Sequence, residues 1–429
     1  MEEYYEAIEF LYTSMPMFQR VGASAYKPGL DTVMLLDEKF GNPHYRYKSI
    51  HIAGTNGKGS TAHTLAAILQ SAGYRVGLYT SPHLVDFRER IRVNGEMISH
   101  EAVVDFVKRY QAMSLNCHPS FFELTMTMAF EYFAKENVDI AVIETGLGGR
   151  LDSTNIITPI LSIITNISFD HTAFLGDSLE TIACEKAGII KPTIPVVIGE
   201  AQGCVRDVFL QKATEQQAPI FFAEDNMTFD SIETLGNGFL YCATPYGDIV
   251  GELMGDCQPK NAATVITAVS QLAKCGIEVS TMAVKEGFAN VGKLTGLMGR
   301  WMTLQHKPHV VCDTGHNVGG WEYLSRRLKS IEGTLHMVIG FVNDKDVSHI
   351  LEMMPKTAKY YFTNASVERA MPASKLAEIA SQCGLNGDVF LTVADAYNAA
   401  LLTSSASNTI FIGGSTFVVA DLLSYVQMK

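Results

Sequence analysis

The sequence lacks the features of a membrane, secreted or nucleic-acid-binding protein. Its eight cysteines include no Cys-x-x-Cys pair, which is typical of reduced thiols in a cytoplasmic protein, and we expect most of them to be buried. No apolar run reaches the about 18 residues that a membrane-spanning helix needs, so no membrane partner is expected. The acidic start, MEEYYEAIEF, lacks the pattern of a signal peptide. These absences together predict a cytoplasmic protein.

Positive charge is also scarce. The chain of 429 residues carries 33 Lys and Arg against 45 Asp and Glu, a formal net charge of -12. We therefore expect no nucleic-acid partner, and an anionic ligand must be held by local donors rather than by the overall field. Hydrophobic residues make up 47% of the sequence, which is enough apolar material for the cores of two or three domains.

Short apolar runs alternate with amphipathic runs along most of the chain, which predicts an α/β fold with mostly parallel sheets and helices on both faces. A glycine-rich stretch at 291–301 interrupts this alternation, which then restarts. We therefore predict two domains, 1–295 and 296–429, with a β-rich excursion at 223–255. The first domain's main predicted strands are 47–54, 75–81, 138–146 and 160–168, and its helices include 60–74 and 120–137.

The strongest local signal is IHIAGTNGKGST, in which a strand leads into a glycine-containing loop and a helix follows. Glycines allow backbone N–H groups to turn inward around phosphate oxygens, and a helix N-terminus adds a positive partial charge. The lysine would place a point charge at the β- and γ-phosphates of a nucleotide. A purely structural turn is the alternative. The predicted ATP-binding residues of this loop are Gly54, Thr55, Asn56, Gly57, Lys58, Gly59 and Ser60.

This loop departs from the Walker pattern, Gly-x-x-x-x-Gly-Lys-[Ser/Thr], which would need a glycine at Ile52 and a hydroxyl group at position 59. The first glycine is instead Gly54, and Gly59 follows the lysine. The form GTNGKGST is similar to that of the Mur ligase superfamily.

Ten motifs over nearly the whole chain resemble the folylpolyglutamate synthase/dihydrofolate synthase family, the folate branch of that superfamily. They are HIAGTNGKGST, TSPHLVDFRERIRVNG, FFELTMTMAFEYFA, VIETGLGGRLDSTN, ITNISFDHTAFLG, IACEKAGIIKP, GRW, CDTGHN, NDKD and FIGGSTFVVADLL.

The resemblance implies an ATP-dependent amide ligase with a P-loop N-terminal domain and a Rossmann-like C-terminal, glutamate ligase domain. Such an enzyme adds L-glutamate to dihydropteroate and to reduced folates through an acyl phosphate. The implied partners are therefore small molecules, and the implied state is a monomer.

The resemblance also implies two magnesium ions. Glu144 and Ser81 match the ligands of one, and His171 matches a ligand of the second. The lysine that matches Lys186 is carbamylated in this family, which turns a cation that would repel a metal into an anionic oxygen ligand. Burial would favour this modification, because carbon dioxide adds to an uncharged amine. Without the resemblance, the sequence favours a solvated helix end for Lys186 and a hydrogen-bonded loop histidine for His171. For Glu144, a solvent-facing loop residue is the alternative.

For the nucleotide, the resemblance implies that Asn261 approaches the adenine, although a polar helix start is the alternative interpretation. Arg300 is expected to reach phosphate and Asp313 the ribose. His316 is a further catalytic candidate, which would organise the phosphate or the glutamate site.

For the acid substrate, the resemblance implies that Phe122 stacks on an aromatic ring and that Asp152 and Ser153 bind dihydropteroate. Without the resemblance, the sequence favours a core position for Phe122. Enzymes restricted to polyglutamylation can depart from the motif GRLD, whereas this chain retains it at residues 149–152. The sequence thus favours both activities over polyglutamylation alone.

Three other classes compete with this interpretation. A ligase that extends peptidoglycan precursors carries an extra N-terminal domain, and we expect too little chain before Gly54 to form one. A P-loop nucleotide hydrolase would release phosphate without an acid and an amine. A non-catalytic nucleotide-binding scaffold is disfavoured because Glu144, His171 and Lys186 are all retained.

Overall fold

The computed structural model describes residues 1–15, 29–225, 228–343 and 347–427. The chain forms two compact units. The first unit comprises Met1–Glu252 and Gln258–Leu297, and the second comprises Leu253–Cys257 and Met298–Lys429. The main division thus falls between residues 297 and 298, two residues after the boundary predicted from the sequence, which lies between residues 295 and 296. The short segment 253–257 belongs to the second unit although first-unit chain flanks it on both sides.

The main sheet of the first unit has eight strands in the order β4-β3-β2-β5-β1-β6-β7-β8. Its central pairs are parallel, and β3 and β4 are antiparallel additions at one edge. The strands are β1 (Lys48–Ala53), β2 (Val76–Tyr79), β3 (Ile91–Val93), β4 (Glu96–Met97), β5 (Ile140–Glu144), β6 (Leu161–Ile164), β7 (Val196–Ile198) and β8 (Ile220–Phe222).

Helices cover both faces of this sheet because its strands are apolar on both faces. In β5, Ile140 and Val142 join the core formed with α4 and α10, whereas Ala141 and Ile143 join the core formed with α5 and α6. This alternation is what a buried parallel strand requires. The helices of the unit are α1 (Glu2–Ser14), α3 (Asp31–Lys39), α4 (Lys58–Ser71), α5 (His100–Ala112), α6 (Phe121–Lys135), α7 (Thr172–Leu175), α8 (Leu179–Ala187), α9 (Gly203–Glu215), α10 (Gln258–Lys274), α11 (Thr281–Ala289) and α12 (Val291–Thr295).

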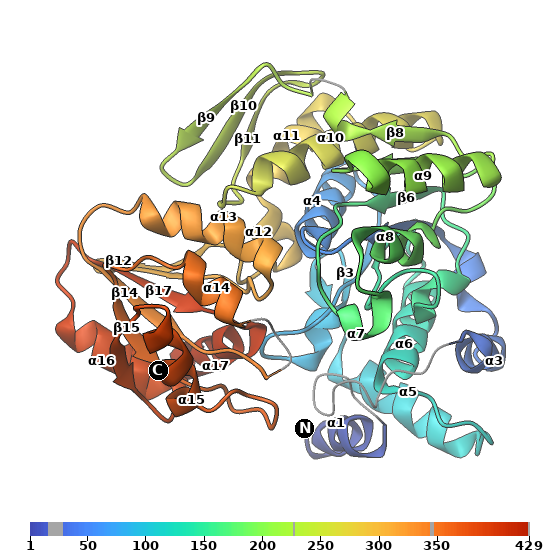
Figure 1. The fold of residues 1–429 in the computed structure, drawn as a ribbon. Coiled ribbons are helices and arrows are strands. Elements are labelled where there is room, and N and C mark those ends of the chain that lie inside the picture. Colours follow the sequence, from blue (N-terminus) through green and yellow to red (C-terminus); the bar gives the residue numbers. More distant parts are fainter. Residues whose placement is uncertain (16–28, 226–227, 344–346, 428–429) are drawn as a thin grey trace. The chain divides into compact units, whose positions relative to one another are not determined.

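A separate antiparallel sheet lies beside α11 in the first unit (Figure 1). It consists of β9 (Ser231–Leu235), β10 (Gly238–Thr244) and β11 (Gly247–Gly251). Tyr241 of β10 contacts Phe288 of α11, with ring centroids 6.1 Å apart, so the small sheet shares the core of α4 and α10. The β-rich excursion predicted at 223–255 is confirmed.

The second unit contains a six-stranded sheet in the order β12-β13-β17-β14-β15-β16, parallel except for the edge strand β12. Trp321 and Phe411 are fully buried at its centre. The predicted α/β architecture is confirmed. The elements are β12 (Met302–His306), β13 (His309–Cys312), α13 (Val318–Lys329), β14 (Leu335–Ile339), α14 (Val347–Met353), β15 (Lys359–Phe362), α15 (Ala373–Gln382), β16 (Gly387–Val389), α16 (Val393–Thr403), β17 (Thr409–Gly413) and α17 (Thr416–Gln427).

The cysteines differ from expectation in one respect. All eight are free, but the prediction that most of them are buried is wrong: only Cys312 is buried, and Cys184 and Cys204 are exposed on the surface helices α8 and α9. Among the helices that the structure describes, none has both the length and the apolar character needed to cross a membrane. Most of the NDKD motif, residues 344–346, lies outside the described residues.

Candidate active site

Four neighbouring strands of the first unit end at the same edge of the main sheet. The order β2-β5-β1-β6 is parallel throughout, so their carboxyl ends lie together. Ser81 follows β2, Glu144 ends β5, Gly54 follows β1 and Thr165 follows β6. Ligands of open parallel sheets usually bind at this edge. The structure thus gathers the P-loop with two of the predicted metal ligands.

The P-loop itself begins and ends on glycines with left-handed backbone angles. Gly54 has a φ of 144° and Gly57 a φ of 83°. A Cβ atom at Gly54 would overlap the hydroxyl group of Thr165, and one at Gly57 would overlap the side-chain oxygen of Asn261. Both positions therefore require glycine for space as well as for conformation.

The segment after β6 holds the P-loop in place. The Thr165 hydroxyl donates to the Asn56 carbonyl oxygen at 2.6 Å, and the Asn56 backbone N–H donates to the Asn166 side-chain oxygen at 2.9 Å. The Thr55 hydroxyl donates to the Ser168 carbonyl oxygen at 3.1 Å and accepts from the Ser168 N–H at the same distance. The loop is therefore fixed by side-chain and backbone groups that lie about a hundred residues away in the sequence.

The start of α4 is held by residues of α10. The Gln258 side chain donates to the Ser60 hydroxyl at 3.4 Å, and the Asn261 amide donates to the Gln258 side-chain oxygen at 3.0 Å. Ser60 and Gln258 are both buried. Asn261 therefore lies against the P-loop at Gly57, and its predicted contact with adenine stays a prediction.

Two lysines converge on one carbonyl group of the P-loop. Lys58 Nζ donates to the carbonyl oxygens of Gly54 and Thr55 at 3.1 and 3.2 Å, and Lys186 Nζ donates to that of Gly54 at 2.9 Å. Lys186 is only 4% exposed. Burial, and then the charge of Lys58, lower the pKa of Lys186 to about 7. The solvated helix-end interpretation of Lys186 is therefore wrong, although the residue does lie in the last turn of α8.

Glu144 is buried at the end of β5, with 3% of its surface exposed. Its Oε2 atom accepts a hydrogen bond from the Ser81 backbone N–H at 3.0 Å. The two predicted ligands of the first metal therefore adjoin each other, and Glu144 is not the solvent-facing loop residue of the alternative interpretation.

His171 follows β6 and adopts a left-handed conformation, with a φ of 50°, immediately before α7. Its backbone N–H donates to the Asp170 carboxylate at 2.9 Å. The same carboxylate acts on Lys186, because Asp170 raises the pKa of that amine against the larger effects of burial and Lys58. Among the described residues, no three His, Cys, Asp or Glu side chains form a group that could hold a metal ion. The role of His171 as a metal ligand stays a prediction.

The predicted folate residues lie around the loop that follows β5. The Phe122 ring is half-buried, 5.8 Å from the Tyr79 ring, and Gly146 passes so close that a Cβ there would lie 2.5 Å from the Phe122 ring. Asp152 is buried and accepts from the Gly146 and Leu147 N–H groups at 2.9 and 2.8 Å. Ser153, the next residue, is half-buried.

The three predicted residues of the second unit lie in two adjoining segments, Arg300 just before β12 and Asp313 and His316 just after β13. Asp313 is half-buried, and its two carboxylate oxygens accept from the backbone N–H groups of Trp301 at 2.7 Å and Gly315 at 2.8 Å. Arg300 donates to the Thr314 hydroxyl, and the His316 Nδ1–H donates to the Thr314 carbonyl oxygen at 3.0 Å. Burial raises the pKa of Asp313, and the Arg300 charge opposes this.

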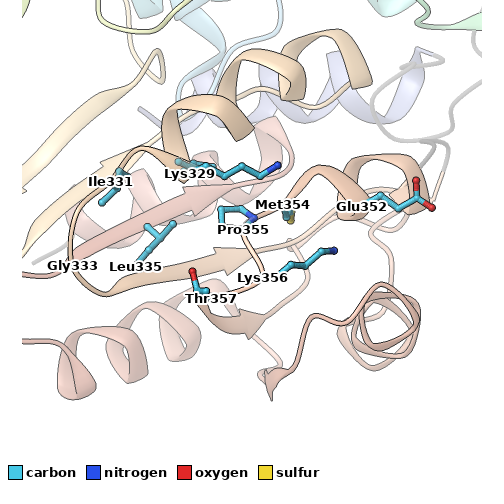
Figure 2. Close-up of a pocket in the computed structure, with 10 residues that line it drawn as sticks. Lys329, Ile331, Gly333, Leu335, Glu352, Met354, Pro355, Lys356 and Thr357 are labelled. Carbon is cyan, nitrogen blue, oxygen red and sulfur yellow. The ribbon is translucent and has the colours of Figure 1, made fainter.

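A pocket of about 200 Å³ in the second unit lies away from these residues (Figure 2). It is formed where α13 leads into β14 and where α14 leads into β15, at the amino ends of the two strands. Ligand sites of parallel sheets lie at the opposite, carboxyl ends. The lining residues are Leu328, Lys329, Ile331, Gly333, Leu335, Glu352, Met354, Pro355, Lys356 and Thr357.

Three residues at the P-loop were not singled out from the sequence. Thr165 and Gln258 brace the loop, and Asp170 lies near both His171 and Lys186. Asp170 carried a signal, since it precedes a predicted metal ligand in FDHT. Thr165 and Gln258 carried none, because their partners are distant in the sequence.

Two family models match the chain. The Mur ligase middle domain matches residues 52–269, and the glutamate ligase domain of Mur ligases matches residues 299–416. The dihydrofolate synthase/folylpolyglutamate synthase of Escherichia coli is 31% identical over 94% of this chain and 92% of its own length. The protein of the same name from Bacillus subtilis is 36% identical over 82% of this chain and 84% of its own length.

Solved structures agree with these relatives. E. coli FolC in complex with DHPP and ADP superposes with a TM-score of 0.85 at 29% identity, covering 99% of this chain and 98% of that one. The bifunctional folylpolyglutamate synthase/dihydrofolate synthase of Yersinia pestis, complexed with AMPPNP and a manganese ion, gives a TM-score of 0.82 at 27% identity, again covering 99% and 98%. On this fold, these motifs and these relatives, the chain belongs to the folylpolyglutamate synthase/dihydrofolate synthase family of ATP-dependent Mur ligases.

Proposed function

We propose that this chain joins L-glutamate to two kinds of acid, dihydropteroate and reduced folates, at the expense of ATP. The observation that carries the proposal is the convergence of Lys58, Glu144 and Lys186 around the P-loop at one sheet edge. A nucleotide-binding loop alone would need neither the buried carboxylate nor the second, buried lysine. Names of the relatives and the ligands in the solved structures point to the same reaction.

In the first step, a carboxylate oxygen of the acid attacks the γ-phosphorus of ATP, the bond to the β–γ bridging oxygen breaks, and ADP leaves. Two anions must approach each other, so positive charge at the P-loop lowers the barrier. Lys58 is suited to this role because its ammonium group already lies at the loop, held by two carbonyl oxygens. The glutamate nitrogen then attacks the acyl carbon, and phosphate leaves as the amide bond forms.

Divalent metal supplies further positive charge to the phosphates when it is bound. Ser81 and Glu144 would hold one magnesium ion, and their oxygen atoms fit its preference for hard ligands. His171 and Lys186 would hold a second. Imidazole nitrogen is an unusual magnesium ligand, so an oxygen supplied by a carbamate on Lys186 would matter there.

Carbamylation of Lys186 is supported by its surroundings. The amine is 4% exposed and has a pKa lowered to about 7, so a sizeable fraction is uncharged near neutral pH and able to add carbon dioxide. The charge of Lys58 acts on this amine and would offset the negative charge of a carbamate.

The acid substrate is proposed to bind beside Phe122, with Asp152 and Ser153 near its pterin end. The half-buried ring of Phe122 supports stacking on an aromatic group. Asp152 accepts four hydrogen bonds within its own loop, so it would act on dihydropteroate mainly through the shape of that loop. The retained GRLD supports activity with both acids; polyglutamylation alone is the alternative.

The unit beginning at Met298 is proposed to supply the remaining contacts. Arg300 and Asp313 would meet the nucleotide, Arg300 at phosphate and Asp313 at the ribose, and His316 would organise the phosphate or the glutamate. Asn261 of the first unit is proposed to meet the adenine. The matched glutamate ligase domain model over 299–416 supports a glutamate site in this unit. A monomeric state and a cytoplasmic location stay predictions from the sequence.

The test is phosphate release with ATP, magnesium and L-glutamate, comparing dihydropteroate with tetrahydrofolate as the acid. Release with both acids, dependent on glutamate, supports the bifunctional enzyme. Release with tetrahydrofolate alone would leave only polyglutamylation. Steady release that needs neither acid nor glutamate would make the chain a nucleotide hydrolase. Lys58→Met provides the background rate, and Lys212→Met, which removes an exposed lysine on α9, provides the matched control.

A further inference from the structure

A buried histidine lies three residues before the P-loop, in the middle of β1. His51 is fully buried, and its Nε2 atom lies 2.8 Å from the Thr154 hydroxyl oxygen. Thr154 is also fully buried, in the short helix η4 (Ser153–Ile156). The reaction proposed above assigns neither residue a role.

Hydrogen-bond donors and acceptors fix the direction of this contact. The Thr154 hydroxyl lies 2.5 Å from Asp152 Oδ1, and the Thr154 backbone N–H donates to the same oxygen at 3.0 Å. Two further N–H groups donate to Oδ2, so the carboxylate is surrounded by donors and the Thr154 hydroxyl must donate to it. The Thr154 oxygen then accepts from His51, which requires the proton on Nε2.

The electrostatics support a single tautomer of His51. Burial, and then the charge of Lys191, lower the pKa of His51 to about 3. The imidazole is therefore neutral and carries one proton. His51 Nδ1 has no hydrogen-bond partner in the part of the chain that the structure describes, and an unpartnered acceptor is less costly there than an unpartnered N–H would be.

The chain of hydrogen bonds ends at the loop that follows Glu144. Asp152 Oδ2 accepts from the backbone N–H groups of Gly146 and Leu147 at 2.9 and 2.8 Å. Gly146 in turn lies against the ring of Phe122. A shift of Asp152 would therefore move the backbone between the predicted metal ligand Glu144 and the predicted aromatic contact of the acid substrate.

We propose that His51 and Thr154 are positioning residues that set the acid-substrate loop, 145–148, through Asp152. The relay runs from the His51 Nε2–H to the Thr154 oxygen, and from the Thr154 O–H to the Asp152 carboxylate. Because His51 lies on the strand that carries the P-loop, one strand locates both the phosphate site and the loop beside the acid. This role in acid binding rests on the proposed function, whereas the relay itself does not.

The first test compares Thr154→Val, which removes the relay hydroxyl, with Thr154→Ser, which retains it. We expect Thr154→Val to raise the KM for dihydropteroate about tenfold and to speed amide exchange at Gly146 and Leu147 by a similar factor. The KM for ATP should stay within about twofold. Thr154→Ser should restore both quantities.

A matched control is Thr267→Val in α10, where a buried threonine hydroxyl donates to the Ala263 carbonyl oxygen. This change should leave the KM for dihydropteroate and the exchange of both loop amides unchanged. Equal effects of Thr267→Val and Thr154→Val, failure of Thr154→Ser to rescue, or faster exchange without a change in the KM would overturn the proposed positioning role.

A second measurement needs no variant. Nitrogen-resolved NMR of the imidazole groups of the intact protein should show His51 with its proton on Nε2, protected from exchange and unchanged between about pH 5 and 8. A proton on Nδ1 would overturn the relay directly. If the protein proves not to ligate glutamate, the proposed function fails, but amide exchange and the tautomer still decide the relay separately.

Discussion

Each unit carries a glycine-containing loop at the carboxyl end of a strand of its parallel sheet, β1 in the first unit and β13 in the second, but the two loops are held in different ways. The loop after β1 is braced from distant segments, by Thr165 and Ser168 after β6 and by Asn261 on α10. The loop after β13 is braced by groups that are close in the sequence, because the Asp313 carboxylate accepts from the N–H groups of Gly315 in the loop and Trp301 just before β12.

The difference indicates how each loop is prepared for a ligand. At the P-loop, several contacts from separate elements stabilise the same backbone conformation, so its shape is set before a phosphate binds. Preorganised electrostatic sites require this. In the second unit, the half-buried Asp313 carboxylate is the charged group that joins the two segments, beside the Thr314 N–H and hydroxyl groups, which donate to the Gly299 carbonyl oxygen. We expect the first loop to tolerate loss of a single brace and the second to depend on Asp313.

The largest expected effect concerns charge rather than bracing. Lys58→Met leaves the contacts of Thr165, Asn166 and Ser168 intact but removes the ammonium group from the loop. We expect kcat for glutamate ligation to fall about 10³-fold, because electrostatic stabilisation at the transferred phosphate is lost. Steady-state phosphate release, with Lys212→Met as the control, measures this. A kcat within tenfold of the parent would mean that the loop's N–H groups suffice.

The next effect separates backbone strain from crowding at the P-loop. Gly57→Ala places a Cβ in a left-handed position and against Asn261, so we expect the affinity for an ATP analogue to fall about 100-fold. Because Asn261 is itself proposed to meet the adenine, Asn261→Ala alone is the reference for a second comparison. In that background Gly57→Ala should cost only about tenfold in affinity, because crowding is relieved while strain persists. Calorimetric titration measures both.

Gly73→Ala is the control for that experiment. Gly73 also has a positive φ, of 91°, but nothing lies near its missing Cβ. It should lose about 1 kcal/mol of stability and bind the analogue normally. If Gly57→Ala also bound normally, the bracing by Asn261 would be irrelevant to the nucleotide.

A smaller effect is expected in the second unit. Asp313→Asn replaces one acceptor oxygen by an NH₂ group that faces a backbone N–H. We expect amide exchange at Trp301 and Gly315 to quicken by a factor that corresponds to about 2 kcal/mol. Asp421→Asn is the control. Its carboxylate is half-buried at the surface and accepts from the Ser366 N–H and hydroxyl groups, so we expect solvent to replace the lost hydrogen bond. Slow exchange in Asp313→Asn would show that this loop is braced from elsewhere.

The smallest effect is a pH dependence that arises behind the P-loop. The unfolded chain protonates His51 near its ordinary pKa of 6.5, whereas burial lowers the pKa to about 3 in the folded protein. The unfolded state therefore binds more protons between these values, and stability falls as the pH decreases through them.

Between about pH 7 and 5 the His51 contribution amounts to about 2 kcal/mol. His51→Gln retains a donor near the Nε2 position but cannot titrate. The free energy of unfolding measured with urea should therefore fall less in this variant than in the parent as the pH decreases from about 7 to 5. Parallel loss in both proteins would mean that His51 is not the titrating group.

The sequence predicted the P-loop and β5 well because their signals are local. Glycines at 54 and 57 specify a turn, and an apolar run ending in Glu144 specifies a buried strand with a polar end. Both the mostly parallel sheet and the position of Glu144 at the ligand edge follow from the alternation of strands and helices, whereas the strand order does not.

The braces were not predictable in the same way. Thr165 and Gln258 are ordinary polar residues in a strand end and a helix start, and only folding brings them to Asn56 and Ser60. Lys186 was ambiguous for a related reason. Its amine donates to the Gly54 carbonyl oxygen of the P-loop, and the residues around 186 give no sign of this distant contact.

Because it includes the short segment 253–257, the second unit is not formed by one continuous stretch of the chain. Met254 packs against its apolar core, and Asp256 pairs with Arg327 at 3.3 Å. A gene fragment that begins at Met298 would encode every strand of that unit and still lack these five residues. Recombination that exchanges this unit between relatives therefore has to preserve two separated stretches of the gene, and a single crossover would leave a core filled partly by one parent and partly by the other.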